Sequence, residues 1–169
     1  TLDGHCWVPQ ERGSHNVGQR FIYEPVFMTD HVVLDTNVLY AALRSRRGAS
    51  RRVVDLVLEE DLTAHVSVPL VLEYEEVLLR EAEALGITAR EARVVIAALV
   101  QRADRHAIHF RWPAYVRDPD DSHVLDTAVA ASCPHLLTFN KSDFHRASAL
   151  NVTLLTPREF LAQVFHDPN

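Results

Sequence analysis

The sequence predicts a three-layer α/β fold, in which a five-stranded, mostly parallel sheet carries helices on both faces. Two observations support this. Short strand-like runs alternate with segments of helical periodicity along the chain after residue 28. The first of these runs, VVL at residues 32–34, is apolar throughout, which is typical of a parallel strand covered on both faces.

The elements follow one another in a regular order. Strands are predicted at residues 31–35, 62–66, 106–110, 136–139 and 152–155. Helices are predicted at residues 37–44, 49–60, 68–84 and 119–132, with two more that open at Thr88 and Thr156. This alternation favours β-α-β units over a separate all-β or all-α domain.

Capping residues support several of these helices. Ser67 before Pro69 is typical of a helix N-terminus, and Gly86 is typical of a C-terminus. Thr88 and Glu91 have the spacing of a capping box. The helix that follows is expected to bury one apolar face, formed by Val94, Val95, Ala98 and Leu99.

Residues 1–27 differ from the rest of the chain. They contain three of the five glycines and show no clear period. The single methionine is Met28, and the regular pattern begins directly after it. We therefore expect an N-terminal extension of unknown origin at residues 1–27 and one domain at residues 28–169.

Composition narrows the class of protein. The chain has 169 residues and a net charge of 17 − 23 = −6, which argues against simple electrostatic coating of nucleic acid. Its two cysteines, Cys6 and Cys133, fit neither a disulfide framework nor a zinc motif. No apolar run approaches the roughly 20 residues that span a bilayer. We expect a cytoplasmic protein without a membrane segment.

Acidic residues fall where predicted elements end. Asp35 ends the first strand, and Glu73 lies two turns into the helix after the second strand. The other acids of this kind are Asp118, Asp120, Asp121 and Asp143. Because the carboxyl ends of parallel strands share one edge of a sheet, these acids are expected to converge there.

Crowded carboxylates repel one another, and a divalent cation resolves that conflict. Mg²⁺ and Mn²⁺ prefer oxygen ligands and stabilise charge on a phosphate during in-line displacement. The acids therefore point to phosphodiester hydrolysis. Each also has a structural interpretation: Asp35 and Asp118 as helix N-caps, and Glu73 as part of a charged helix face.

Other polar residues extend the hypothesis. Asn37, Thr138 and Asn140 are candidates to orient the ligands, although the two asparagines suit turns as well. Trp112 and Tyr115 are candidates to stack on bases or to pack against the core. Basic residues that could bind phosphates, or form a solvated loop, are Arg44, Arg46, Arg47, Arg51, Arg52 and Lys141.

Four segments in this order resemble the PIN-domain family: VVLDTNVLYAAL, SVPLVLEYEEVL, RDPDDSHVLDTAVAA and LLTFNKSDF. The resemblance covers about residues 31–162 and is greatest to bacterial VapC-like toxins of toxin–antitoxin pairs. It implies a PIN fold with a five-stranded parallel sheet. It also implies a ribonuclease that depends on Mg²⁺ or Mn²⁺.

The resemblance assigns roles to individual residues. Asp35 matches the family's first acid, and Glu73, six residues after Ser67, matches the helix acid. Asp121 best matches the third acid, and Asp118 is a close alternative. At the fourth position this chain has Asn140 where many relatives have an aspartate, and Asp143 follows three residues later.

The expected function is an endoribonuclease acting on RNA, as the toxin of a toxin–antitoxin pair. A cognate antitoxin and a second copy of the chain are its expected partners. Two alternatives remain open: a PIN nuclease of RNA processing or decay without a toxin role, and a binding module weakened by the loss of its fourth acid.

Overall fold

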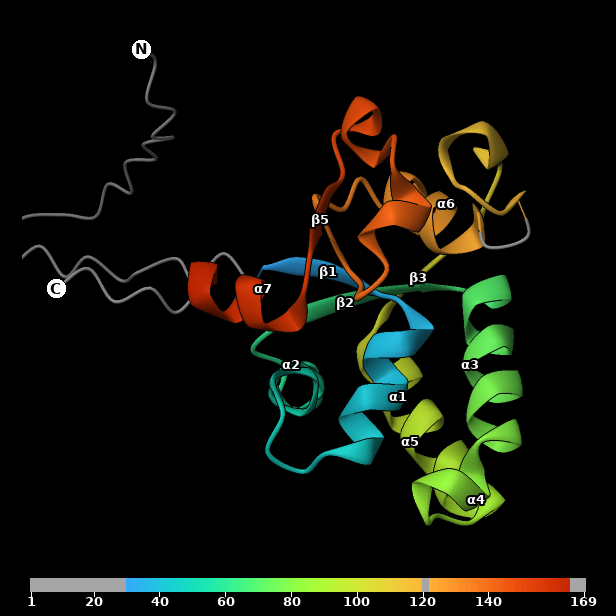
Figure 1. Ribbon diagram of the computed structural model, residues 1–169, viewed down its shortest axis with the longest axis vertical. Coiled ribbons are helices and arrows are strands. Elements are labelled where there is room, and N and C mark those ends of the chain that lie inside the picture. The colour runs from blue at the N-terminus through green and yellow to red at the C-terminus, as the bar shows by residue number, and fades with distance from the viewer. Residues whose placement is uncertain (1–29, 120–121, 165–169) are drawn as a thin grey trace, which may run out of the picture.

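A computed structural model describes residues 30–119 and 122–164, and confirms the α/β fold (Figure 1). Five parallel strands form the sheet in the order β3-β2-β1-β4-β5. They are β1 (His31–Leu34), β2 (Thr63–Ser67), β3 (Asp104–His106), β4 (His135–Leu137) and β5 (Thr153–Leu155). The extension expected at residues 1–27 lies outside the described residues.

Helices cover both faces of the sheet. Those of the chain up to β3 gather on one face, and α6 lies across the other (Figure 1). The helices are α1 (Thr36–Arg44), α2 (Ala49–Leu58), α3 (Val68–Arg80), α4 (Ala82–Leu85), α5 (Ala89–Arg102), α6 (Ser122–Ala130) and α7 (Pro157–Val164). Short 3₁₀ segments within the described residues include η1 (Pro113–Tyr115), η3 (Lys141–Phe144) and η4 (Ala147–Leu150).

The central strand β1 is the most deeply buried part of the core. Val32, Val33 and Leu34 are each at most 1% exposed. On one side Val33 pairs with Leu136 of β4, and on the other Val32 pairs with Ala64 of β2. This burial on both faces explains why the strand lacks alternation.

The direction in which the chain adds strands reverses next to β1. From β1 the chain builds β2 and β3 on one side, and then crosses to β4 and β5 on the other. Ligands of open α/β sheets bind outside the strand ends at such a reversal. The two residues that leave the sheet there are Asp35, after β1, and Thr138, after β4.

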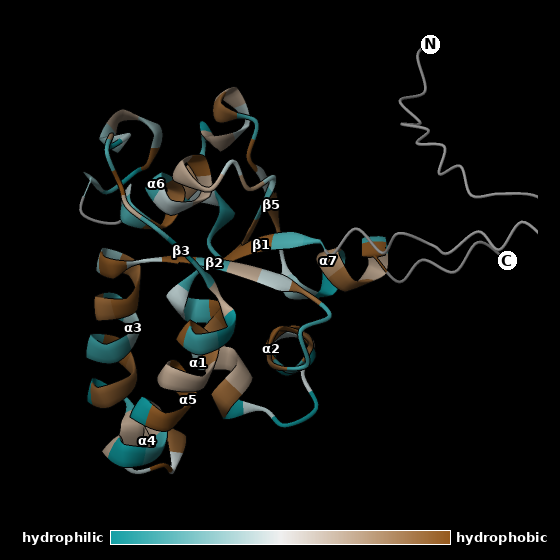
Figure 2. Ribbon diagram, turned by 180° about the vertical axis from the view of Figure 1, so that it is seen from behind, coloured by the Kyte–Doolittle hydropathy of each residue, from teal (hydrophilic) through white to brown (hydrophobic). Residues whose placement is uncertain are grey.

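Helix α3 is fixed by its buried face. Leu70, Tyr74 and Leu78 recur every four residues and are fully buried, and hydrophobic and hydrophilic bands alternate along the helix (Figure 2). The hydroxyl of Tyr74 also donates to the carbonyl oxygen of Leu34 at the end of β1. These contacts hold α3 beside the end of β1.

The predicted helix caps are confirmed at several positions. Ser67 Oγ accepts from the backbone N–H of Leu70 at 3.4 Å. Thr88 and Glu91 form both hydrogen bonds of a capping box. Gly86 has φ +68°, the left-handed conformation that glycine adopts without strain at a helix C-terminus.

Several predicted boundaries were wrong. The third strand is residues 104–106 rather than 106–110, because it is a short edge strand with little burial, and Phe110 beyond it is 78% exposed. The helix predicted to reach residue 84 breaks at Glu81 into α3 and α4. Helix α6 begins at Ser122, three residues after the predicted start at Pro119.

The buried face of α5 agrees with the prediction in part. Leu99 is fully buried as predicted, and Val95 and Ala98 are partly buried, whereas Val94 is 61% exposed. Ala92 and Ile96, which were not predicted, complete the buried face.

Candidate active site

Asp35 occupies the junction of β1 and α1. As the N-cap of α1 its carboxylate accepts from the backbone N–H of Asn37 at 3.4 Å, so the capping interpretation is correct. The same carboxylate accepts a bond of 2.6 Å from Thr138 Oγ1 and one of 2.7 Å from Asn37 Nδ2. Asp35 is therefore both a cap and a carboxylate held by the ends of two neighbouring strands.

The electrostatics of Asp35 are unusual for an aspartate. Its side chain is almost fully buried, and burial is the main cause that raises its pKa from 3.8 to about 6. The negative charge of Glu73 raises it further, while the bond from Thr138 opposes the shift. A cation beside this carboxylate would compensate for the hydration that the charge loses on burial and for the repulsion from Glu73.

Glu73 lies across the cavity on α3. Its carboxylate is hydrogen bonded to His123 Nε2 of α6. Burial alone would raise the pKa of Glu73, but the bond from His123 and contributions from Thr36 lower it below the usual value. The Thr36 hydroxyl is buried and its geometry falls short of a hydrogen bond to any described residue.

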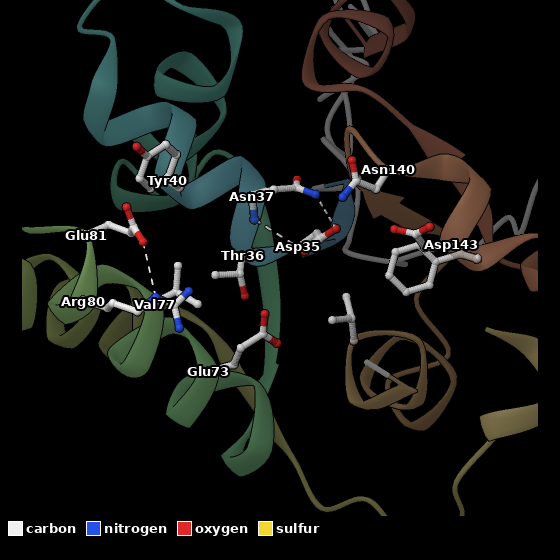
Figure 3. A pocket seen from close by; sticks show the side chains of 12 residues that line it. Asp35, Thr36, Asn37, Tyr40, Glu73, Val77, Arg80, Glu81, Asn140 and Asp143 are labelled. Carbon is white, nitrogen blue, oxygen red and sulfur yellow. Dashed lines mark hydrogen bonds and ion pairs between the residues drawn. The ribbon is translucent and has the colours of Figure 1, made fainter. Parts of the chain in front are cut away.

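One open cavity of about 320 Å³ joins these groups. Figure 3 shows Asp35 and Asn37 facing Asn140 and Asp143 on one side and Glu73 on the other. The residues that line it are Asp35, Thr36, Asn37, Tyr40, Glu73, Val77, Arg80, Glu81, Val124, Asn140, Asp143 and Phe144. Three of the acids expected from the sequence thus share one cavity.

The remaining predicted acids lie at or near its margin. Asp118 lines a second, adjoining hollow with Arg117, and Asp143 borders both spaces. The backbone N–H of Arg117 donates to the carbonyl oxygen of Asp143 at 2.7 Å, which ties the two segments together. Asp120 and Asp121 lie outside the described residues, so the choice between Asp118 and Asp121 stays open.

The family model of the PIN domain matches residues 31–142, about two thirds of the chain. The chain belongs to the PIN-domain family. A comparison with curated proteins gave no match. Proteins with a PIN domain are typically nucleases and generally use divalent metal ions, so the family expected from the four segments is confirmed.

The chemistry of the cavity fits the metal use of PIN domains. Asp35 and Glu73 supply two mutually repelling carboxylates, and Thr36 supplies a buried oxygen between them. Mg²⁺ and Mn²⁺ take oxygen ligands and often only one or two carboxylates from the protein. Within residues 30–119 and 122–164, however, no three His, Cys, Asp or Glu side chains lie close enough to enclose an ion by themselves.

The basic residues predicted to bind RNA lie elsewhere on the PIN domain. Thr36 begins α1 at the cavity and Arg44 ends it, about 12 Å farther along the axis. Arg51 forms an ion pair with Asp55 of the same helix, and Arg52 forms one with Glu59, which directly follows the helix. Lys141 Nζ lies 2.5 Å from Glu159 Oε2 of α7.

The aromatic candidates sit beside α6. Trp112 and Tyr115 pack edge to face, and the backbone N–H of Trp112 donates to the buried carboxylate of Asp126 at 2.7 Å. Asp126 is 1% exposed, and this bond anchors the loop to α6.

Sequence reasoning missed two groups in this PIN domain. His123, which binds Glu73, was not singled out, because the pair joins α6 to α3 across 50 residues and no local pattern marks it. Arg80 lies seven residues after Glu73, a spacing that places both on one face of α3. That spacing was a usable signal.

None of the described helices is both long and apolar enough to cross a membrane.

Proposed function

We propose that this PIN domain is an endoribonuclease that depends on Mg²⁺ or Mn²⁺. The observation that carries the proposal is the buried carboxylate of Asp35, placed where the strand order reverses and sharing its cavity with Glu73 and Asp143. Such a position is where open α/β sheets bind their ligands. A divalent ion bound there would supply an activated water and stabilise charge on the phosphate.

Each residue has a defined task in this proposal. Asp35 and Glu73 hold the ion, with Asp121 as the third ligand and Asp118 as its alternative. Thr138 and Asn37 fix the carboxylate of Asp35 through the bonds of 2.6 and 2.7 Å. In the same way His123 holds Glu73.

The opposite wall completes the proposed site. Asn140 and Asp143 border the cavity there, and Asp143 binds a second ion or acts through water. The arginines at the end of α1, one helical turn beyond the cavity-lining Tyr40, bind the strand after it leaves the cavity.

The decisive experiment is RNA cleavage by the purified protein. Single-stranded RNA and DNA of one sequence are incubated with Mg²⁺, Mn²⁺ or EDTA, using wild type, Asp35→Asn and the matched control Asp61→Asn, which changes an exposed carboxylate. We expect RNA cleavage that requires metal and Asp35 and survives in the control. Cleavage that persists in EDTA or in folded Asp35→Asn would overturn the metal assignment.

A binding module is the second candidate, and two observations favour it. Asn140 stands where many relatives have an acid, and the described residues contain no group of three acids close enough to enclose an ion. In that case the protein binds RNA or a partner without metal. Binding of labelled RNA in EDTA, with no cleavage under any metal, would establish this function instead.

The biological role proposed here is that of a cytoplasmic toxin, inhibited by an antitoxin and assembled as a homodimer. It is supported by the similarity of the four segments to VapC-like toxins. Expression in bacteria tests it: growth should stop with wild type, continue with Asp35→Asn, and recover when the neighbouring small gene is expressed too. Normal growth beside active RNA cleavage in vitro would favour a nuclease of RNA processing.

A further inference from the structure

The cavity that contains Asp35 holds one positive side chain among the described residues that line it. Four carboxylates border this space: Asp35, Glu73, Glu81 and Asp143. Arg80 is the single cation on the same lining. A polyanion entering an acidic cavity needs positive charge beside its phosphates, and guanidinium groups match phosphate geometry well.

Arg80 is placed by the helix that also carries Glu73. Seven residues separate them, which is two helical turns and about 10 Å along the axis. Val77, one turn before Arg80, lies between them on the same wall (Figure 3). Arg80 therefore lies beside the reacting centre rather than within it.

The contacts of Arg80 leave it able to bind a ligand. Nη1 lies 3.4 Å from Glu76 Oε1, and Nε lies 3.3 Å from Glu81 Oε1. Both are single, exposed ion pairs of the kind that contribute little to stability. The third nitrogen, Nη2, donates to no described residue.

The other basic residues are placed less well for this task. The arginines predicted from the sequence begin at Arg44, at the far end of α1. Lys141 is paired with Glu159 on the side of α7. Neither residue lines the cavity.

We propose that Arg80 binds a phosphate of the RNA strand that flanks the phosphate being hydrolysed. The inference rests on the proposed function in that it needs a nucleic-acid strand in this cavity. Arg80 then contributes to substrate binding rather than to the chemical step. Strand entry replaces the contacts with Glu76 and Glu81 by stronger bonds to phosphate oxygens.

The test compares Arg80→Ala and Arg80→Lys with a matched control, Arg93→Ala. Arg93 lies on α5, is 59% exposed against 58% for Arg80, and forms a similar ion pair, with Glu75. It does not line the cavity. Binding of a short single-stranded RNA is measured in the Asp35→Asn background over a range of salt, and kcat and KM are measured with Asp35 present.

We expect Arg80→Ala to weaken RNA binding several-fold and to lower the salt slope by about 0.7, the value for one contact to a single strand. KM should rise with kcat unchanged, Arg80→Lys should recover part of the loss, and Arg93→Ala should resemble wild type. Equal binding by Arg80→Ala and Arg93→Ala would overturn the inference. So would a fall in kcat at constant KM, because Arg80 would then act on the reacting phosphate.

The two proposals fail in different ways. RNA cleavage that is indifferent to Arg80 removes this inference and keeps the nuclease. Binding that depends on Arg80, without cleavage by wild type under any metal, removes the nuclease and keeps the phosphate contact.

Discussion

Thr138 Oγ1 donates to Asp35 Oδ2 at 2.6 Å, and this bond joins the carboxyl ends of the neighbouring strands β4 and β1. The same hydroxyl accepts from the backbone N–H of Asn140 at 2.9 Å. One buried side chain thus orients both the carboxylate of Asp35 and the backbone of Asn140. The site depends on the register between two strands that are about 100 residues apart in the chain.

Replacing Thr138 with valine should therefore destabilise the protein and disturb the site. Valine has a similar volume but cannot donate a hydrogen bond to the buried carboxylate of Asp35. Because a bond to a charged group is lost, the free energy of unfolding should fall by about 2 kcal/mol. Urea unfolding at pH 7 measures this. The control is Thr153→Val, at an exposed position of β5. Equal unfolding free energies for the two variants would contradict the role given to Thr138.

The raised pKa of Asp35 predicts a pH-dependent cost in the absence of metal. Between about pH 4 and 6 the folded protein binds more protons at Asp35 than the unfolded chain, so the unfolding free energy falls as pH rises through this window. The shift of the Asp35 pKa from 3.8 to about 6 lowers the free energy of unfolding by about 3 kcal/mol above pH 6.

Asp35→Asn should remove that cost. In EDTA its stability relative to wild type should increase from pH 4 to 6 and then stay constant. Urea unfolding at several pH values tests this, with Asp61→Asn as the exposed control. A difference that does not vary with pH would show that Asp35 is not the titrating group.

Divalent metal should stabilise the wild type for the same electrostatic reason. A ligand that binds only the folded protein adds about 2.7 kcal/mol at 100 times its dissociation constant. In thermal unfolding at pH 7.5, the melting temperature of the wild type should rise with Mn²⁺ or Mg²⁺ and return to its original value with EDTA. The melting temperature of Asp35→Asn should change little. An equal response from both proteins would place the ion elsewhere.

The sequence predicted the layers and the acids because those depend on local patterns. Apolar runs mark buried strands, and Asp35 directly follows one of them. The edge strand β3 gave no comparable signal, because His106 is only partly buried and Asp104 is exposed. Its boundary is decided by pairing with β2, a contact between residues about 40 positions apart.

The parts of the site that the sequence did not predict also depend on contacts between distant residues. His123 reaches Glu73 from a different element, 50 residues away, and no local pattern marks such a pair. The arginine cluster of residues 44–52 was recognised because its charges lie close together in the sequence. Its position relative to the cavity depends on the path of α1, which no local pattern gives.

A row of three histidines crosses strands β1, β2 and β3, and none of the three lines the cavity. His31 Nδ1 lies 2.8 Å from His65 Nε2, and His65 Nδ1 lies 2.9 Å from His106 Nε2. Burial, then the charges of His106 and His31, lower the pKa of His65 from 6.5 to about 4, against a smaller effect of Asp104.

This row should destabilise the protein in acid. Below about pH 6.5 the unfolded chain binds more protons than the folded one at His65, so the unfolding free energy falls as pH decreases toward 4. His65→Gln should flatten this decrease in urea unfolding between pH 6.5 and 4, and the exposed control His109→Gln should not. Because Asp35 acts in the opposite direction over part of this window, the comparison is clearest in the Asp35→Asn background.

Asn140 allows the number of metal ions to be tested directly. It lines the cavity opposite Glu73, and Asn140→Asp would place a further carboxylate beside Asp35 and Asp143. Without metal, the added charge should raise the pKa of Asp35 further and lower the unfolding free energy at pH 7.5. With Mn²⁺, it should tighten binding or add a second equivalent.

Calorimetric titration with Mn²⁺ measures affinity and stoichiometry together. The control Ser142→Asp adds the same charge two residues away, at an exposed position that does not line the cavity. If both variants bind Mn²⁺ as the wild type does, the amide at Asn140 does not limit metal binding. A second equivalent in Asn140→Asp alone would show that this side chain sets the number of ions.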